Sequence, residues 1–127
     1  EVQQQANVEL AQSYLDQARY EEHNGRLLEA ALSYERAARG RPNSQIFERA
    51  AHCLLEGRGD LKKAGELARK AVSLVPAQSE PRLTLAKIYL SAGMRESALK
   101  EFERAGEISP GDDTIKDWIR RIRRGEV

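Results

Sequence analysis

Glycine, alanine and proline recur at a fixed interval of 34 residues along this chain. The recurring sets are Gly25, Gly59 and Gly93; Ala30, Ala64 and Ala98; Ala37, Ala71 and Ala105; and Pro42, Pro76 and Pro110. A period of this length, kept in register three times, is typical of an array in which one supersecondary unit stacks on the next. We therefore expect three copies of one small unit.

Each recurring residue has a place in a pair of helices. Glycine suits the tight turn between the helices, where φ is positive or two backbones approach closely. The alanines, seven residues apart, lie on one face of the second helix and let a neighbouring helix come close. Proline follows that helix because it cannot continue it. The repeating unit is therefore a helix, a turn and a second helix.

The composition favours an all-α fold. Alanine, leucine, glutamate, arginine and lysine dominate the 127 residues, and no segment alternates apolar and polar residues long enough to predict a strand. The 21 basic and 20 acidic residues leave a formal net charge of +1, so any basic site must be local.

The chain has one cysteine, Cys53, and therefore no intramolecular disulfide framework. This favours a reducing, cytoplasmic compartment. No apolar run approaches the roughly 18 residues that a membrane span needs. The only methionine is Met94, so we expect the sequence to be an excerpt or a processed form.

Residues 79–112 resemble a tetratricopeptide repeat, and the matching positions are Leu85, Ala86, Tyr89, Gly93, Ala98, Phe102, Ala105 and Pro110. The second period has Ala68 where that family usually has an aromatic residue. Its first helix fits better when shifted by one residue, with the turn at 57–59 absorbing the difference. The first period has Gln17 and Glu21 at positions that are usually apolar.

The resemblance implies an α-solenoid of three helix-turn-helix repeats with a carboxyl-terminal capping helix, seven helices in all. The expected segments are an amino-terminal helix extension at 1–10, repeats at 11–43, 44–78 and 79–112, and the capping helix within 113–127. We expect the first helices of the pairs at 5–23, 45–56 and 80–91, the second helices at 27–39, 61–74 and 95–108, and the last helix at 113–124.

The last predicted helix has an apolar stripe with basic residues opposite. The stripe is Ile115, Trp118, Ile119 and Ile122, and the basic residues are Arg120, Arg121, Arg123 and Arg124. Such a helix covers the apolar end of a repeat stack. Acid-first pairs four residues apart, such as Glu35 with Arg39 and Asp117 with Arg121, are expected to stabilise the helix surfaces.

The residues give no support to catalysis. His52 and Cys53 are adjacent, so on a helix they point about 100° apart and are poorly placed to act as base and nucleophile. No spacing of histidine, cysteine or carboxylate residues predicts a metal site, and no Gly-rich loop predicts a phosphate site. We therefore predict no enzyme activity, no cofactor, no metal and no small-molecule substrate.

The resemblance implies that the first helices line a concave groove that binds a peptide or a partner helix. The groove positions correspond here to Gln12, Leu15, Arg19, Glu22, Glu48, Arg49, His52, Leu83, Thr84, Lys87 and Leu90, with Gln45, Glu56 and Glu80 as further candidates. Arg19, Arg49 and Lys87 would form a basic strip beside leucines, suited to an acidic partner with apolar residues. The alternative is that these are ordinary solvated charges, partly neutralised by Glu22, Glu48 and Glu80.

One ligand of the family is not expected. Members that hold the carboxyl-terminal tail of a heat-shock protein use a carboxylate clamp of lysines, asparagines and an arginine. The corresponding positions here are Leu15, Arg19, Arg49 or Ala50, Glu80 and Thr84, with no asparagine and with an acid in place of a lysine. The expected function is a non-catalytic scaffold or adaptor for another protein.

Two other functions remain open. The first is self-association into a homo-oligomer, through the first helix or through the cap, so the sequence does not decide between monomer and oligomer. The second, less favoured, is contact of the Arg-rich last helix with nucleic acid or an anionic membrane. Trp118 lies on the apolar stripe and is expected under the cap instead.

Overall fold

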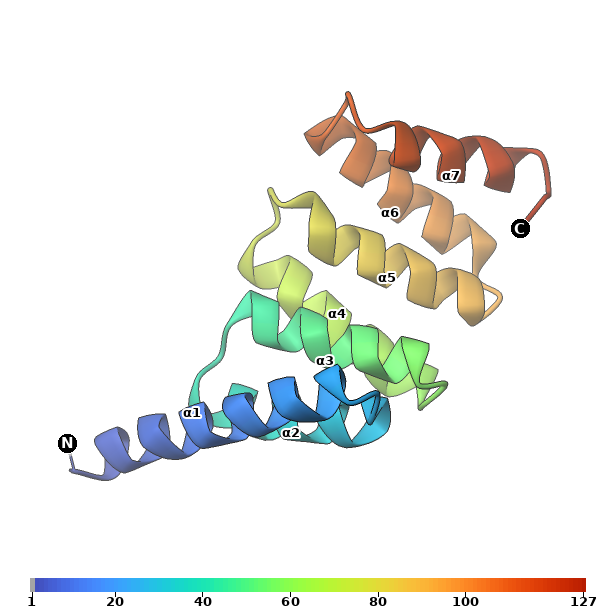
Figure 1. Ribbon diagram of the computed structural model, residues 1–127. Helices are drawn as coiled ribbons and strands as arrows, with labels where there is room; N and C mark the ends of the chain where they lie inside the picture. Colours follow the sequence, from blue (N-terminus) through green and yellow to red (C-terminus); the bar gives the residue numbers. More distant parts are fainter. Residues whose placement is uncertain (1) are drawn as a thin grey trace.

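The computed structural model describes residues 2–127, which form seven α-helices stacked in the order of the chain (Figure 1). The helices are α1 (Val2–His23), α2 (Leu27–Gly40), α3 (Ser44–Glu56), α4 (Leu61–Leu74), α5 (Ser79–Ser91), α6 (Arg95–Ile108) and α7 (Asp113–Arg123). The predicted all-α stack of helix pairs is confirmed. The predicted bounds agree within one residue, except that α1 begins three residues earlier than expected. No helix within residues 2–127 is both long and apolar enough to cross a bilayer.

The turns between paired helices share one backbone arrangement. Gly25 and Gly93 have φ of 76° and 77°, the left-handed conformation that glycine adopts without strain. In the middle pair the left-handed residue is Arg58, with φ of 57°, and not Gly59. The turn has therefore moved one residue toward the amino terminus, as the predicted shift of α3 requires.

Gly59 is needed for a different reason. A Cβ atom at this position would lie 2.8 Å from side-chain atoms of both Leu28 and Leu54, so the glycine permits a close approach. The extra residue after the turn places Asp60 at the start of α4, where its carboxylate accepts hydrogen bonds from the backbone N–H groups of Lys62 (2.9 Å) and Lys63 (3.2 Å).

The repeated alanines lie where the helices cross. All six are fully buried, with no exposed surface: Ala30, Ala37, Ala64, Ala71, Ala98 and Ala105. A methyl side chain is the largest group that lets backbones approach so closely. The period in the sequence is therefore the period of the helix crossings.

The size of one buried side chain differs from pair to pair. Ala68 is fully buried in α4, and next to it α3 packs directly against α5. The equivalent residues, 34 positions away, are Tyr34 in α2 and Phe102 in α6. Phe102 stacks on Trp118 of α7, with ring centroids 5.3 Å apart and an interplanar angle of 10°. Tyr34 and Phe102 fill the space between neighbouring first helices. In the middle pair the smaller Ala68 leaves this space unfilled, and α3 and α5 come into contact there.

The helix α7 covers the last pair as predicted. Ile115 has no exposed surface and Ile122 is 5% exposed, while Trp118 and Ile119 are half-buried against the same apolar cluster. Arg123 of α7 pairs with Glu103 of α6 at 2.8 Å. The apolar stripe is thus used for packing, and the arginines face outward.

The structure explains why Gln17 and Glu21 of the first pair are polar at positions that are usually apolar in the family. Gln17 is exposed, because no helix within residues 2–127 covers that face of α1. Glu21 is buried, and its carboxylate accepts a hydrogen bond of 2.5 Å from the hydroxyl of Ser33.

The predicted ion pairs four residues apart do not form in the described part of the chain. Glu35 pairs instead with Lys63 on the neighbouring pair of helices, at 3.0 Å, and Asp117 pairs with Arg120. The predicted pairs were those possible within a single helix. In the stack, Glu35 of α2 also lies next to Lys63 of the neighbouring helix α4.

Substituting Arg58 by glycine is expected to stabilise the domain by about 0.5–1 kcal/mol. The left-handed conformation costs a side chain with a Cβ about 1–2 kcal/mol, and the greater freedom of glycine in the unfolded chain offsets part of the gain. Denaturant unfolding measures the change. Arg58→Ala keeps the Cβ and serves as the control, and an equal gain in both variants would contradict the explanation.

Substituting Ala98 by arginine is expected to destabilise the domain by about 4 kcal/mol or more, because the helix crossing has no space and the charge would be buried without a partner. Ala6 is exposed on α1, so Ala6→Arg is the matched control. Thermal melting followed by circular dichroism compares the two variants. A melting curve for Ala98→Arg close to that of the wild type would refute the assigned register.

Candidate functional site

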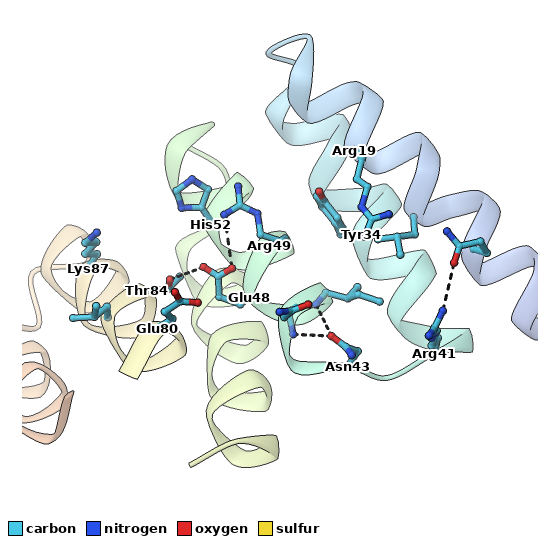
Figure 2. A pocket seen from close by; sticks show the side chains of 15 residues that line it. Arg19, Tyr34, Arg41, Asn43, Glu48, Arg49, His52, Glu80, Thr84 and Lys87 are labelled. Carbon is cyan, nitrogen blue, oxygen red and sulfur yellow. Dashed lines mark hydrogen bonds and ion pairs between the residues drawn. The ribbon is translucent and has the colours of Figure 1, made fainter. Parts of the chain in front are cut away.

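A hollow of about 600 Å³ lies between the first helices of the three pairs. We call it the inner groove, and its lining residues are Gln12, Leu15, Arg19, Tyr34, Arg41, Asn43, Gln45, Ile46, Glu48, Arg49, His52, Glu80, Leu83, Thr84 and Lys87. Figure 2 shows ten of these side chains with labels, and they come from all three pairs of helices. The groove is therefore assembled only when the pairs stack.

Nine of the eleven groove positions inferred from the sequence line this hollow, and Glu22 and Leu90 do not. The carboxylate of Glu22 is turned into a network with Tyr34 and Arg49. Leu90 is half-buried against the apolar cluster that includes Phe102. Both side chains are thus used for packing within the domain. Of the further candidates, Gln45 and Glu80 line the groove and Glu56 does not.

Sequence reasoning missed four lining residues: Tyr34, Arg41, Asn43 and Ile46. Tyr34 belongs to a second helix and occupies a core position, so only its hydroxyl indicated a polar neighbour. Asn43 caps α3, where its side-chain oxygen accepts a hydrogen bond of 2.8 Å from the N–H of Gln45. An asparagine just before a helix is a recognisable capping signal. Arg41 lies in the connection between pairs, outside the family positions used for the prediction.

Glu22 joins three helices through two residues that line the groove, Tyr34 and Arg49. Its carboxylate accepts a hydrogen bond of 2.7 Å from the hydroxyl of Tyr34 in α2, and another from Arg49 in α3. Burial alone would raise the pKa of Glu22, but the bonds from Arg49 and Tyr34 lower it below its ordinary value. Burial and the neighbouring Glu22 carboxylate raise the pKa of Tyr34, so Tyr34 remains a hydrogen-bond donor.

The predicted basic strip is interrupted at its centre. Arg49 pairs with Glu22 and lies 3.9 Å from Glu48, so its charge is largely neutralised. Arg19 and Lys87 line the groove on either side, and neither has a carboxylate within 4.0 Å among residues 2–127 (Figure 2). Arg41 adds a third cation, whose contact is a weak hydrogen bond of 3.4 Å to the side chain of Gln12.

Two acids lie between these cations. Glu48 accepts a hydrogen bond of 2.9 Å from the hydroxyl of Thr84, which ties α3 to α5 (Figure 2). Glu80 is exposed at the start of α5 and lines the same hollow. The groove therefore carries separate positive and negative places instead of one continuous basic surface.

His52 and Cys53 have different surroundings. His52 is half-buried and lines the groove, whereas Cys53 has no exposed surface. Burial, with the nearby Glu22 carboxylate, raises the pKa of the Cys53 thiol to about 12. A thiol with this pKa is not a nucleophile near neutral pH. Residues 2–127 contain no cluster of three histidine, cysteine or acidic side chains placed to hold a metal ion.

Replacing Glu22 by glutamine is expected to destabilise the domain by about 1 kcal/mol at pH 7, since the bond to Arg49 is partly screened by solvent. The pKa of Glu22 is lowered in the folded protein, so its contribution is full above the unfolded value of 4.5 and is lost as pH falls through the folded value. The difference in unfolding free energy between wild type and Glu22→Gln should therefore shrink on acidification from about pH 5 to pH 3. Glu66 is exposed, and Glu66→Gln provides the control. A difference that stays constant over this pH range would contradict the network.

The family and its solved structures agree with this architecture. The tetratricopeptide repeat family model matches residues 55–117. No curated protein sequence matches the chain.

Among solved structures, the first tetratricopeptide domain of Spaghetti (RPAP3), bound to the HSP90 peptide SRMEEVD, is similar with a TM-score of 0.84 at 18% identity, covering 93% of this chain and 94% of that one. The Arabidopsis OM64 tetratricopeptide domain gives 0.83 at 18% identity, covering 93% and 98%. MamA gives 0.84 at 15% identity, covering 91% and 68%.

Identities this low establish the shared fold and leave the ligand undetermined. The family model, the three helix pairs and these structures together assign the chain: it belongs to the tetratricopeptide repeat family, whose domains are generally protein–protein interaction modules and typically non-catalytic.

Proposed function

We propose that this domain is an adaptor that binds an acidic peptide segment with apolar residues in the inner groove. The observation that carries the proposal is the groove itself, a hollow of about 600 Å³ in which Arg19, Arg41 and Lys87 have no carboxylate partner among residues 2–127. Arginine and lysine without a partner are available to a ligand carboxylate.

Apolar side chains that line the groove beside these cations support the proposal that the ligand also has apolar residues. Three apolar side chains line the groove: Leu15 of α1, Ile46 of α3 and Leu83 of α5. A ligand with apolar residues between its acids would bury them there, and burial supplies affinity that exposed ion pairs alone do not.

Glu48 and Glu80 restrict which acidic peptides fit. A carboxylate placed over the centre of the groove would face these two glutamates, so like charges disfavour a uniformly acidic ligand. We propose a ligand with acids toward its ends and apolar or neutral residues at its centre.

The same glutamates argue against the terminal peptides of heat-shock proteins. Spaghetti (RPAP3) is bound to the HSP90 peptide SRMEEVD in its solved structure. Here Glu80 stands where a carboxylate clamp is expected to have a lysine, and the hydroxyl of Thr84 donates a hydrogen bond to Glu48. We propose that this groove does not hold such a carboxyl-terminal tail.

The arginines of α7 give less support to a nucleic-acid or membrane contact. Arg120 pairs with Asp117, Arg123 pairs with Glu103, and Arg121 lies over the ring of Trp118 at 5.2 Å. All three arginines of α7 are thus engaged within the domain.

The double substitution Arg19→Glu/Lys87→Glu is expected to weaken binding of groove peptides at least about tenfold, because each reversed charge repels a ligand acid. Peptides are first selected against the wild-type domain from a displayed random library, and fluorescence anisotropy then measures their Kd. Enrichment of peptides with acids at the ends and apolar residues at the centre is expected.

Lys62 and Lys100 are exposed and lie outside the groove, so Lys62→Glu/Lys100→Glu is a control with the same change in net charge. Equal weakening in both double variants, or enrichment of basic peptides, would contradict the proposal. The peptide SRMEEVD is measured in parallel. Micromolar binding that is lost in Arg19→Ala would overturn the exclusion of a carboxylate clamp.

A further inference from the structure

A second hollow, of about 320 Å³, lies between the amino-terminal half of α1 and the carboxyl-terminal end of α2. We call it the edge pocket and define it by Leu10, Tyr14, Arg36, Arg39 and Gly40. None of these residues lines the inner groove. At 100° per residue, Leu10 and Tyr14 point to a different side of α1 from Leu15 and Arg19, so a ligand here would not enter the groove.

The pocket exists because α1 is longer than the repeat needs. This helix has 22 residues, whereas α3 and α5 have 13 each. At 1.5 Å per residue the excess of nine residues adds about 13 Å, and the amino-terminal part of α1 runs past the rest of the stack in Figure 1.

Gly40 lets the long helix cross the end of α2. A Cβ atom at Gly40 would lie 2.9 Å from the carbonyl oxygen of Asn7 and 3.0 Å from the Cβ of Ala11. The two backbones therefore meet at this point, and the pocket opens beside the crossing. Leu10 stays 54% exposed there, so more than half of this apolar side chain is uncovered by residues 2–127.

The pocket also holds two cations that the fold does not neutralise. Among residues 2–127 no carboxylate lies within 4.0 Å of Arg36 or Arg39. Glu35, the acid expected to pair with Arg39, is held by Lys63 at 3.0 Å. Arg36 lies over the ring of Tyr14, 5.8 Å from its centroid. By contrast, three of the four cations that line the hollow on α7, namely Lys116, Arg120 and Arg123, have acidic partners.

We propose that the edge pocket is a second recognition site, which binds a short acidic segment carrying leucine or phenylalanine on a partner protein. The apolar side chain packs on Leu10 and Tyr14, and flanking carboxylates pair with Arg36 and Arg39. Leu10 and Tyr14 are one helical turn apart, so an extended ligand needs only about three or four residues to contact the whole site. This proposal is independent of the ligand of the inner groove.

The labelled peptide Ser-Asp-Glu-Leu-Phe-Asp-Glu-Ser is the probe. Fluorescence anisotropy is expected to give saturable binding with a Kd below about 1 mM, weakened at least about tenfold by Arg36→Glu/Arg39→Glu and about fivefold by Leu10→Ser. Peptides with serine in place of Leu-Phe, or with amides in place of the acids, are expected to bind at least about fivefold more weakly. Backbone amide resonances of residues 7–14 and 36–40 should shift during titration.

The controls separate this site from the inner groove. Because the probe also has the acidic ends and apolar centre proposed for a groove ligand, its titrations are made in the Arg19→Glu/Lys87→Glu background, where binding to the edge pocket should persist. Lys62→Glu/Lys100→Glu should leave the Kd of the probe within about twofold. Circular dichroism checks folding, and the milder Arg36→Gln/Arg39→Gln tests the site if charge reversal unfolds the domain. Absence of saturable binding, loss of binding in the groove variant, or shifts confined to residues 45–52 would each overturn the proposal. Sedimentation showing wild-type dimers that Arg36→Glu/Arg39→Glu dissociates would also overturn it, since the occupant would then be a second copy.

Discussion

The close approach of helices at buried alanines is the constraint on which the rest of this structure depends. Because residues such as Ala64 and Ala98 have no exposed surface, each helix axis is fixed relative to the next, and the first helices are lined up along one face. No first helix could form the inner groove alone. The surface proposed for binding is therefore a consequence of packing on the other side of the same helices.

One buried position then sets the shape of that surface. In the middle pair, Ala68 allows α3 and α5 to pack together, and Glu48 and Thr84 share a hydrogen bond across them. In the first pair, Tyr34 lines the groove and links to Arg49 of α3 through Glu22. The groove is open beside Tyr34 because an aromatic ring stands where Ala68 stands in the next pair. A hydroxyl in a core position thus becomes part of the groove floor.

The repeat could be predicted from the sequence because its causes are local. Glycine turns, small residues at crossings and proline after helices act within one unit, and their period predicts helix bounds within one residue for five of the six helices of the pairs. Contacts between units could not be predicted in this way. Arg49 was expected to face a ligand, with neutralisation by glutamates such as Glu22 as the alternative, and only the stacked structure decides between the two by bringing Glu22 to its guanidinium. Glu35 likewise had a predicted partner on its own helix, and the stack supplied Lys63.

The distribution of charge follows from the same competition between local and stacked partners. The chain has 21 basic and 20 acidic residues. A cation therefore indicates a binding surface only where its expected acidic partner is paired elsewhere in the stack or where no acid lies nearby. Arg39 is in the first situation, because Lys63 holds Glu35, and Lys87 is in the second. Cations left in this way beside exposed or half-buried leucines are suited to an acidic, apolar ligand, whereas the paired arginines of α7 are not. Stacking therefore selects which of many surface charges remain available for recognition.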